Sequence, residues 1–134
     1  MDKRTTVVFE NNGKNSVNVG KSGSGETVTL DRENGIGMTA GELLLMSLAS
    51  CTIGTVQEYL ISKDIEIGPL RVEASCAFSK TNQKYVDLDL LVKCNADTSD
   101  RVKTAMLNAA KTCRIHKTLH GGPTINVELE ASLT

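Results

Sequence analysis

The sequence lacks a surplus of charge of either sign. Its 134 residues carry 15 Lys and Arg against 16 Asp and Glu, which gives a formal net charge of -1, and both signs are scattered along the chain. Nucleic-acid-binding domains gather basic residues into a patch or stripe, and this sequence contains no such footprint. We therefore expect no nucleic-acid partner.

The hydrophobic pattern of the sequence also shows no export signal and no membrane-spanning segment. The charged start, Asp2-Lys3-Arg4, is not followed by the apolar core of a signal peptide. We expect no stretch to reach the roughly 20 apolar residues that cross a bilayer. These absences predict a soluble, cytoplasmic protein with no membrane partner. The length suits a single domain, residues 1–134, that is large enough to bury a core.

A disulfide framework and a zinc motif are lacking too. No Cys-x-x-Cys pair occurs among the four cysteines, which are Cys51, Cys76, Cys94 and Cys113. In a chain without an export signal, such thiols are expected to be reduced. Cys113, His116 and His120 have a spacing that would allow a metal site, but the Gly121-Gly122 that follows is typical of a helix stop. We expect no metal and no bound cofactor.

Hydrophobic alternation and turn residues predict an α+β domain with the element order βββ-α-ββ-α-β. Asn11-Asn12-Gly13 and the segment Thr81-Asn82-Gln83-Lys84 favour hairpin turns. The second helix is expected to begin at an N-cap formed by Asp97 or Thr98, with Asp100 in its first turn. The strands are predicted at 4–10, 16–20, 27–30, 70–78, 86–94 and 123–133, and the helices at 39–62 and 98–116.

The first predicted helix begins with a capping box, Thr39-x-x-Glu42, and is apolar nearly all round. Such a helix needs cover on every side, and this chain offers only one small sheet and one other long helix. A second copy would supply the missing cover, so we predict an obligate homodimer with this helix near its centre. Gly54 inside the helix indicates a close contact or space beside Cys51.

Each cysteine has a structural and a chemical interpretation. Cys76 and Cys94 fall on the inward faces of the two long strands, where a small apolar side chain is explanation enough. Cys113 falls on the apolar stripe in the last turns of the second helix. Cys51 lies in the middle of the first helix, either as core filler or as a reactive thiol.

Two segments that carry cysteines resemble a known family. The run Met38-Thr-Ala-Gly-Glu-Leu-Leu-Leu-Met-Ser-Leu-Ala-Ser-Cys51-Thr52 is similar to the central helix of the OsmC and organic hydroperoxide resistance (Ohr) family. The run Ala109-Ala-Lys-Thr-Cys113-Arg-Ile-His-Lys-Thr-Leu119 is similar to its second cysteine motif. The motifs, their separation and the strand order cover nearly the whole chain. By this resemblance the chain is identified as a member of the family, in its OsmC-like branch rather than Ohr proper.

The resemblance implies a thiol-dependent peroxidase built as an intertwined homodimer. Cys51 matches the peroxidatic cysteine and Cys113 the resolving one, so that a Cys51 sulfenic acid would condense with Cys113 to a disulfide. An external dithiol reductant would then restore the thiols. An apolar lining favours organic hydroperoxides, because each buried methylene contributes about 0.8 kcal/mol.

The residues that would activate the thiolate depart from the Ohr pattern. In Ohr, an arginine near the second strand and a glutamate ahead of the cysteine helix form an activating ion pair. Here the segment 12–16 contains no arginine, and the glutamate position falls on Gly41. Glu42, Lys14 and Arg32 are the candidate accessory residues. Glu42 is otherwise a cap residue, and the two cations are otherwise surface charges.

Helix geometry separates Glu42 from Cys51 by about 13 Å along the axis, on nearly opposite faces. The dipole of their own helix fades within its first turn, and apolar surroundings raise a thiol pKa, so we expect no lowered pKa for Cys51. Arg114, beside Cys113, has either a surface or an active-site role. Two functions therefore remain open: a Cys51/Cys113 peroxidase, or a non-catalytic OsmC-like dimer that binds a small apolar ligand or senses oxidants.

Overall fold

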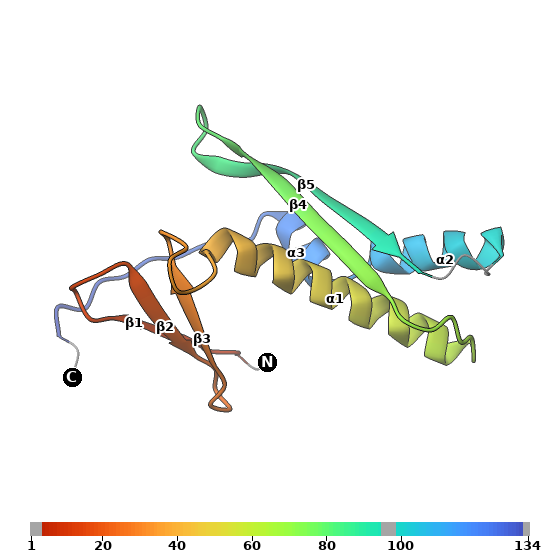
Figure 1. Cartoon of the computed structure of the whole chain (residues 1–134), viewed down its shortest axis with the longest axis horizontal. Coiled ribbons are helices and arrows are strands. Elements are labelled where there is room, and N and C mark those ends of the chain that lie inside the picture. Colours follow the sequence, from red (N-terminus) through yellow and green to blue (C-terminus); the bar gives the residue numbers. More distant parts are fainter. Residues whose placement is uncertain (1–3, 95–98, 133–134) are drawn as a thin grey trace. The chain divides into compact units, whose positions relative to one another are not determined.

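A computed structural model describes residues 4–94 and 99–132 of the chain (Figure 1). The residues form two compact units. The first contains the described residues up to Ser47 together with Ala74–Asp89, and the second contains Leu48–Glu73 together with the described residues from Leu90 onward. The elements, in chain order, are β1 Val8–Asn11, β2 Val17–Lys21, β3 Thr27–Asp31, α1 Ala40–Ser62, β4 Arg71–Ser79, β5 Lys84–Lys93, α2 Asp100–Ala110 and α3 Arg114–Gly121.

The first three strands form the predicted antiparallel meander in the order β1-β2-β3. Phe9 of β1 pairs with Gly20 of β2, and the Phe9 ring covers the space that a side chain at residue 20 would fill. The β1–β2 turn is held by asparagine side chains: Asn11 Oδ1 accepts the Gly13 N–H at 2.6 Å. These contacts fix the register that the alternation predicts.

A buried side-chain pair closes the end of this sheet. Ser16 Oγ donates to Asp31 Oδ1 at 2.6 Å, and both residues are buried. Asp31 also accepts main-chain N–H groups from the turn that follows β3, including that of Glu33 at 3.0 Å. These hydrogen bonds hold the pKa of the Asp31 carboxyl below its usual range, with the Ser16 hydroxyl as the largest cause.

The predicted capping box starts α1. The Thr39 N–H donates to Glu42 Oε1 at 2.8 Å, and the Glu42 N–H donates to Thr39 Oγ1 at 3.2 Å. At the other end, Asp64 has a left-handed φ of 54° and the Ile65 N–H donates to the Leu60 carbonyl at 2.9 Å. This is a Schellman ending, with the apolar Ile65–Leu60 contact that accompanies it. The predicted limits of the helix, 39–62, are confirmed.

From residue 48 onward, only one stripe of α1 is fully buried by its own chain, and the residues beside it are half-buried or exposed. Leu48, Thr52, Val56 and Leu60 recur at every fourth residue and are at most 5% exposed. On other sides of the helix, Ile61 is 78% exposed, and a Cβ added at Gly54 would meet no atom within 4 Å. The cover expected on every side of α1 is therefore not supplied by this chain, and Gly54 does not mark a contact within it.

The core of the second unit lies where α1 packs against α2. Val56 and Leu60 of α1 meet Met106 and Ala110 of α2. Cys94, which follows β5, packs against this cluster, as expected for a small apolar side chain. The other half-buried members of the cluster are Tyr59, Ile65, Ile67, Leu70, Val92 and Val102.

The hairpin β4–β5 carries the two long strands that alternation predicts (Figure 1). Its turn lies at residues 80–83, one residue earlier than the segment 81–84 that was expected to form it. Inward positions along both strands are half-buried, Cys76 among them, and Phe78 packs edge-on against Tyr85 with ring centroids 5.5 Å apart.

The single second helix predicted over 98–116 is wrong. Two helices occupy the segment, because α2 ends at Ala110 and α3 starts at Arg114. Ser99 is the N-cap of α2, accepting the Val102 N–H at 3.3 Å, and Asp100 lies in the first turn as expected. The N-cap candidates Asp97 and Thr98 lie outside the described residues.

The terminal strand predicted over 123–133 is not formed by residues 123–132, and residue 133 lies outside the described residues. Ile125, Val127 and Leu129 are 82 to 92% exposed. Alternation alone does not make a strand, since a strand also needs a neighbouring edge to satisfy its main-chain hydrogen bonds.

Candidate thiol site

The site begins at the break between α2 and α3, where Cys113 is the N-cap of α3. Its backbone is extended, with φ −61° and ψ 146°, and its Sγ accepts the His116 N–H at 3.2 Å. Cys113 is completely buried. A thiol thus takes the place usually held by a serine, threonine or aspartate side chain at the start of a helix.

Main-chain groups in the first turn of α3 also lower the pKa of the Cys51 thiol. The main-chain N–H of Ile115 is the largest cause that lowers the pKa of the Cys51 thiol below its usual range. Burial opposes this effect, while the Cys113 side chain, the Arg114 N–H and the Arg114 charge add to it. Donors at a helix N-terminus stabilise the thiolate because the helix dipole is positive there.

The lowered pKa corrects the expectation drawn from α1 alone. The dipole of α1 does fade before it reaches Cys51, but the dipole that acts on the sulfur belongs to α3. No residue pattern indicates the start of α3, because the break at 111–113 contains neither glycine nor proline. Cys51 and Cys113 are close enough for their side chains to interact, and both are free thiols.

Thr52 is a third member of the site that sequence reasoning missed. Its side chain is completely buried between α1 and the start of α3. Thr52 Oγ1 lies 2.8 Å from the Leu48 carbonyl oxygen and 3.8 Å from Cys113 Sγ. The residue is recognisable in the sequence only as the neighbour of Cys51.

The three accessory candidates all lie in the first unit. Glu42 is engaged in the capping box with Thr39, which supports its structural interpretation. Lys14 and Arg32 line one open cavity of about 710 Å³, so the structure does bring these two cations to a common site.

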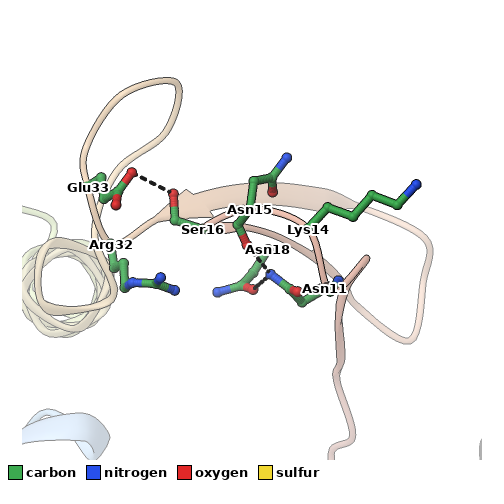
Figure 2. Close-up of a pocket in the computed structure, with 8 residues that line it drawn as sticks. Asn11, Lys14, Asn15, Ser16, Asn18, Arg32 and Glu33 are labelled. Atoms are coloured by element: carbon green, nitrogen blue, oxygen red, sulfur yellow. Dashed lines mark hydrogen bonds between the residues drawn. The ribbon is translucent and has the colours of Figure 1, made fainter.

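Within that cavity, Arg32 extends toward Asn18, whereas Lys14 extends away from the other lining side chains (Figure 2). Neither cation forms an ion pair with a described residue. The lining residues are Asn11, Gly13, Lys14, Asn15, Ser16, Asn18, Arg32 and Glu33.

The histidines form no metal centre with Cys113 in the part of the chain that the structure describes. The rings of His116 and His120 lie 6.2 Å apart on α3, and Cys113 Sγ is engaged by the His116 main chain. Gly122 ends α3 in a left-handed conformation with φ 61°, which agrees with the helix stop expected here.

The sequence model of the OsmC-like protein family matches residues 32–128. This range makes up most of the chain and includes both cysteine segments. The chain belongs to the OsmC-like protein family. No curated protein matches its sequence.

Solved structures of this family share the fold. The OsmC-like protein from Mycoplasma pneumoniae is 23% identical, with 91% of each chain covered and a TM-score of 0.79. The organic hydroperoxide resistance protein OhrB of Bacillus subtilis is 17% identical, with 90% of this chain and 93% of that chain covered and a TM-score of 0.64. An organic hydroperoxide resistance protein OsmC from Legionella pneumophila is 16% identical, with 89% of this chain and 90% of that chain covered and a TM-score of 0.65.

The length and composition of α1 have two interpretations. Among the described residues, α1 is the one helix long and apolar enough to cross a membrane by length and composition, which corrects the expectation that no stretch approaches this limit. The same length and composition also occur in the core helices of proteins that lie in no membrane, and Val56 and Leu60 of α1 belong to the buried core of the second unit.

Proposed function

We propose that this chain is a thiol-dependent peroxidase that reduces organic hydroperoxides through Cys51, with Cys113 as the resolving thiol. The observation that carries the proposal is the lowered pKa of the Cys51 thiol, whose largest cause is the main-chain N–H of Ile115 and to which the Cys113 side chain and the Arg114 main-chain N–H add. A thiolate is the nucleophile in peroxide reduction, and these donors stabilise it. They take the role of the arginine that the chain lacks.

The reaction has three balanced steps. The Cys51 thiolate attacks the terminal oxygen of the hydroperoxide, the O–O bond breaks, and the alcohol leaves with a proton, so that sulfur is oxidised to sulfenic acid. Cys113 then attacks the Cys51 sulfur, and the sulfenic oxygen leaves as water with the thiol proton. An external dithiol reduces the resulting disulfide by exchange and is itself oxidised to a disulfide.

The apolar composition of α1 supports an organic hydroperoxide over hydrogen peroxide as the substrate. Its sequence from Leu43 to Ile53 contains no Asp, Glu, Lys or Arg, and the two charged residues of the helix are Glu42 and Glu58. An alkyl chain that packs on such a surface gains about 0.8 kcal/mol for each buried methylene. Hydrogen peroxide has no group that makes this contact.

The protein works as a homodimer in this proposal. A second copy would cover the exposed side of α1 around Gly54, where this chain leaves open space. It would also offer a sheet edge to the alternating segment 123–132, which forms no strand within its own chain. The segment would bring Ile125, Val127 and Leu129, which are 82 to 92% exposed, to such an interface.

Stopped-flow oxidation with cumene hydroperoxide tests the activity. The wild-type chain is expected to lose the Cys51 thiol orders of magnitude faster than a free thiol, and Cys51→Ser is expected to abolish the reaction. Cys76→Ser is the matched control, because Cys76 is a half-buried thiol on β4 outside the site, and it should react like the wild type. Equal rates for wild type and free thiol would refute the peroxidase.

That negative outcome would favour the second function, a dimer that binds a small apolar ligand or senses oxidants. The exposed apolar side of α1 supports it, since Met46 and Ile61 are 53% and 78% exposed. Binding of a hydrophobic fluorescent probe that an unlabelled fatty acid displaces, in protein that does not react with peroxide, would identify this function.

A further inference from the structure

The fully buried Thr52 is next to Cys51 in the sequence and next to Cys113 in space. It follows Cys51 on α1 and is rotated from it by about 100° around the helix. Its hydroxyl nevertheless meets Cys113 Sγ at 3.8 Å, and the Cys51 side chain interacts with the same sulfur. Cys113 is therefore held from two adjacent positions of α1.

The hydroxyl of Thr52 is itself anchored. It has one proton and two possible acceptors, the Leu48 carbonyl oxygen at 2.8 Å and Cys113 Sγ at 3.8 Å. The carbonyl lies at the usual length of an O–H···O bond and is a stronger acceptor than sulfur, so it receives the proton. The same oxygen lies 3.8 Å from Cys113 Sγ, the distance of a weak hydrogen bond between a hydroxyl and a sulfur atom.

We propose that Thr52 is a positioning residue for Cys113: its anchored hydroxyl fixes the Cys113 sulfur beside Cys51 and sets the rate of disulfide formation. The inference rests on the proposed function. In this step the S–S bond forms, the S–O bond of the Cys51 sulfenic acid breaks, and the Cys113 proton leaves with the oxygen as water. The peroxide consumed in the preceding step is the only oxidant required.

The variant Thr52→Val tests the role of the hydroxyl because valine keeps the shape of threonine. The Leu48 carbonyl retains its main-chain helical partner, so no buried acceptor is left without a donor. Thr52→Ser keeps the hydroxyl and removes the methyl group. Thr118→Val is the matched control, because Thr118 Oγ1 also donates to a carbonyl four residues earlier, that of Arg114, but is exposed.

Both steps are followed in each variant after one pulse of cumene hydroperoxide. Thr52→Val is expected to consume peroxide at the wild-type rate but to form the disulfide about fivefold more slowly, the effect of one hydrogen bond. Its sulfenic acid should accumulate and be trapped by dimedone, and the pH profile of the disulfide step should change. Thr52→Ser and Thr118→Val should follow the wild type in both steps.

The possible failures are distinct from one another. A wild-type chain that neither consumes peroxide nor forms a disulfide refutes the proposed function and this inference with it. Disulfide formation at the wild-type rate in Thr52→Val refutes the inference alone. Equal slowing in Thr52→Ser and Thr52→Val also refutes it, because packing of the methyl group would then be responsible. If Thr52→Val does not fold, Thr52→Ala, which also removes the hydroxyl, takes its place in the comparison with Thr52→Ser by the same measurements.

Discussion

Cys113 Sγ accepts the main-chain N–H of His116 at 3.2 Å and thereby caps α3. The same residue is the proposed resolving thiol, so one sulfur has a structural and a chemical role. The two roles can be separated by substitution, because an N-cap needs only an acceptor whereas resolution needs a thiol.

Serine and alanine at this position are therefore expected to behave differently. Cys113→Ser keeps an acceptor and should unfold in urea within about 0.5 kcal/mol of the wild type, whereas Cys113→Ala should lose about 1 kcal/mol. Both variants should retain the Cys51 sulfenic acid after peroxide treatment, detected by dimedone labelling. Equal stability of the two variants would show that the cap contributes nothing.

The Cys51 thiol is expected to titrate below the range of a free thiol. Its rate of alkylation by iodoacetamide, corrected with Cys51→Ser, should reach its plateau at a lower pH than that of free cysteine. Arg114→Gln should raise the pKa only slightly, because the Arg114 charge is the smallest of the causes that lower it. A midpoint at or above that of free cysteine would contradict the role of α3.

The same shift predicts how stability depends on pH. The folded-state pKa of Cys51 lies below its unfolded value, so the stabilisation is fully present above the unfolded pKa of about 8.5. It is lost as the pH falls through the folded pKa. Urea unfolding of wild type and Cys51→Ser should therefore diverge as the pH rises through this window, and parallel curves would exclude the effect.

Gly54→Ala tests the homodimer. Within a single chain the added Cβ meets no atom, so a monomer should gain about 1 kcal/mol from the better helix propensity of alanine. If a second copy packs against Gly54, the same substitution should instead weaken the dimer. Sedimentation at micromolar concentration measures the assembly, and a folded wild-type monomer of 14.4 kDa would refute the dimer.

Ser16→Ala should destabilise the meander by about 1 kcal/mol, because it removes a buried hydrogen bond to Asp31. Since the Ser16 hydroxyl is the largest cause of the lowered Asp31 pKa, the variant should also lose stability at less acidic pH. The sign follows from a folded pKa below the unfolded value of about 3.9. Ser47→Ala, which removes an exposed hydroxyl, is the control, and identical acid unfolding of both variants would contradict the prediction.

The fold was predictable where the signals were local. The Thr39–Glu42 box fixed the start of α1, and alternation placed β4 and β5. The terminal strand was mispredicted because alternation does not show whether a neighbouring edge is available, and residues 123–132 pair with no described strand. The break before Cys113 was missed because its cap is a thiol, which resembles no common N-cap residue in a sequence.

The candidate site was predictable in its cysteines and not in their environment. Resemblance selected Cys51 and Cys113, and both lie within the residues that match the family. The donors to the Cys51 sulfur are main-chain N–H groups, which every residue except proline carries. Their presence depends on where α3 begins, so no search of side chains for an activating cation would find them.

The sulfur cap gives α3 a dependence on redox state. Its first turn contains no acidic residue, so Cys113 and Cys51 are the acceptors that serve its leading N–H groups. A disulfide sulfur carries no charge and accepts hydrogen bonds weakly. Joining the two thiols would therefore fray the start of α3, and the amide protons of Arg114, Ile115 and His116 should exchange faster in the oxidised protein. A dithiol reductant would then approach its disulfide through a loosened segment rather than past an intact helix.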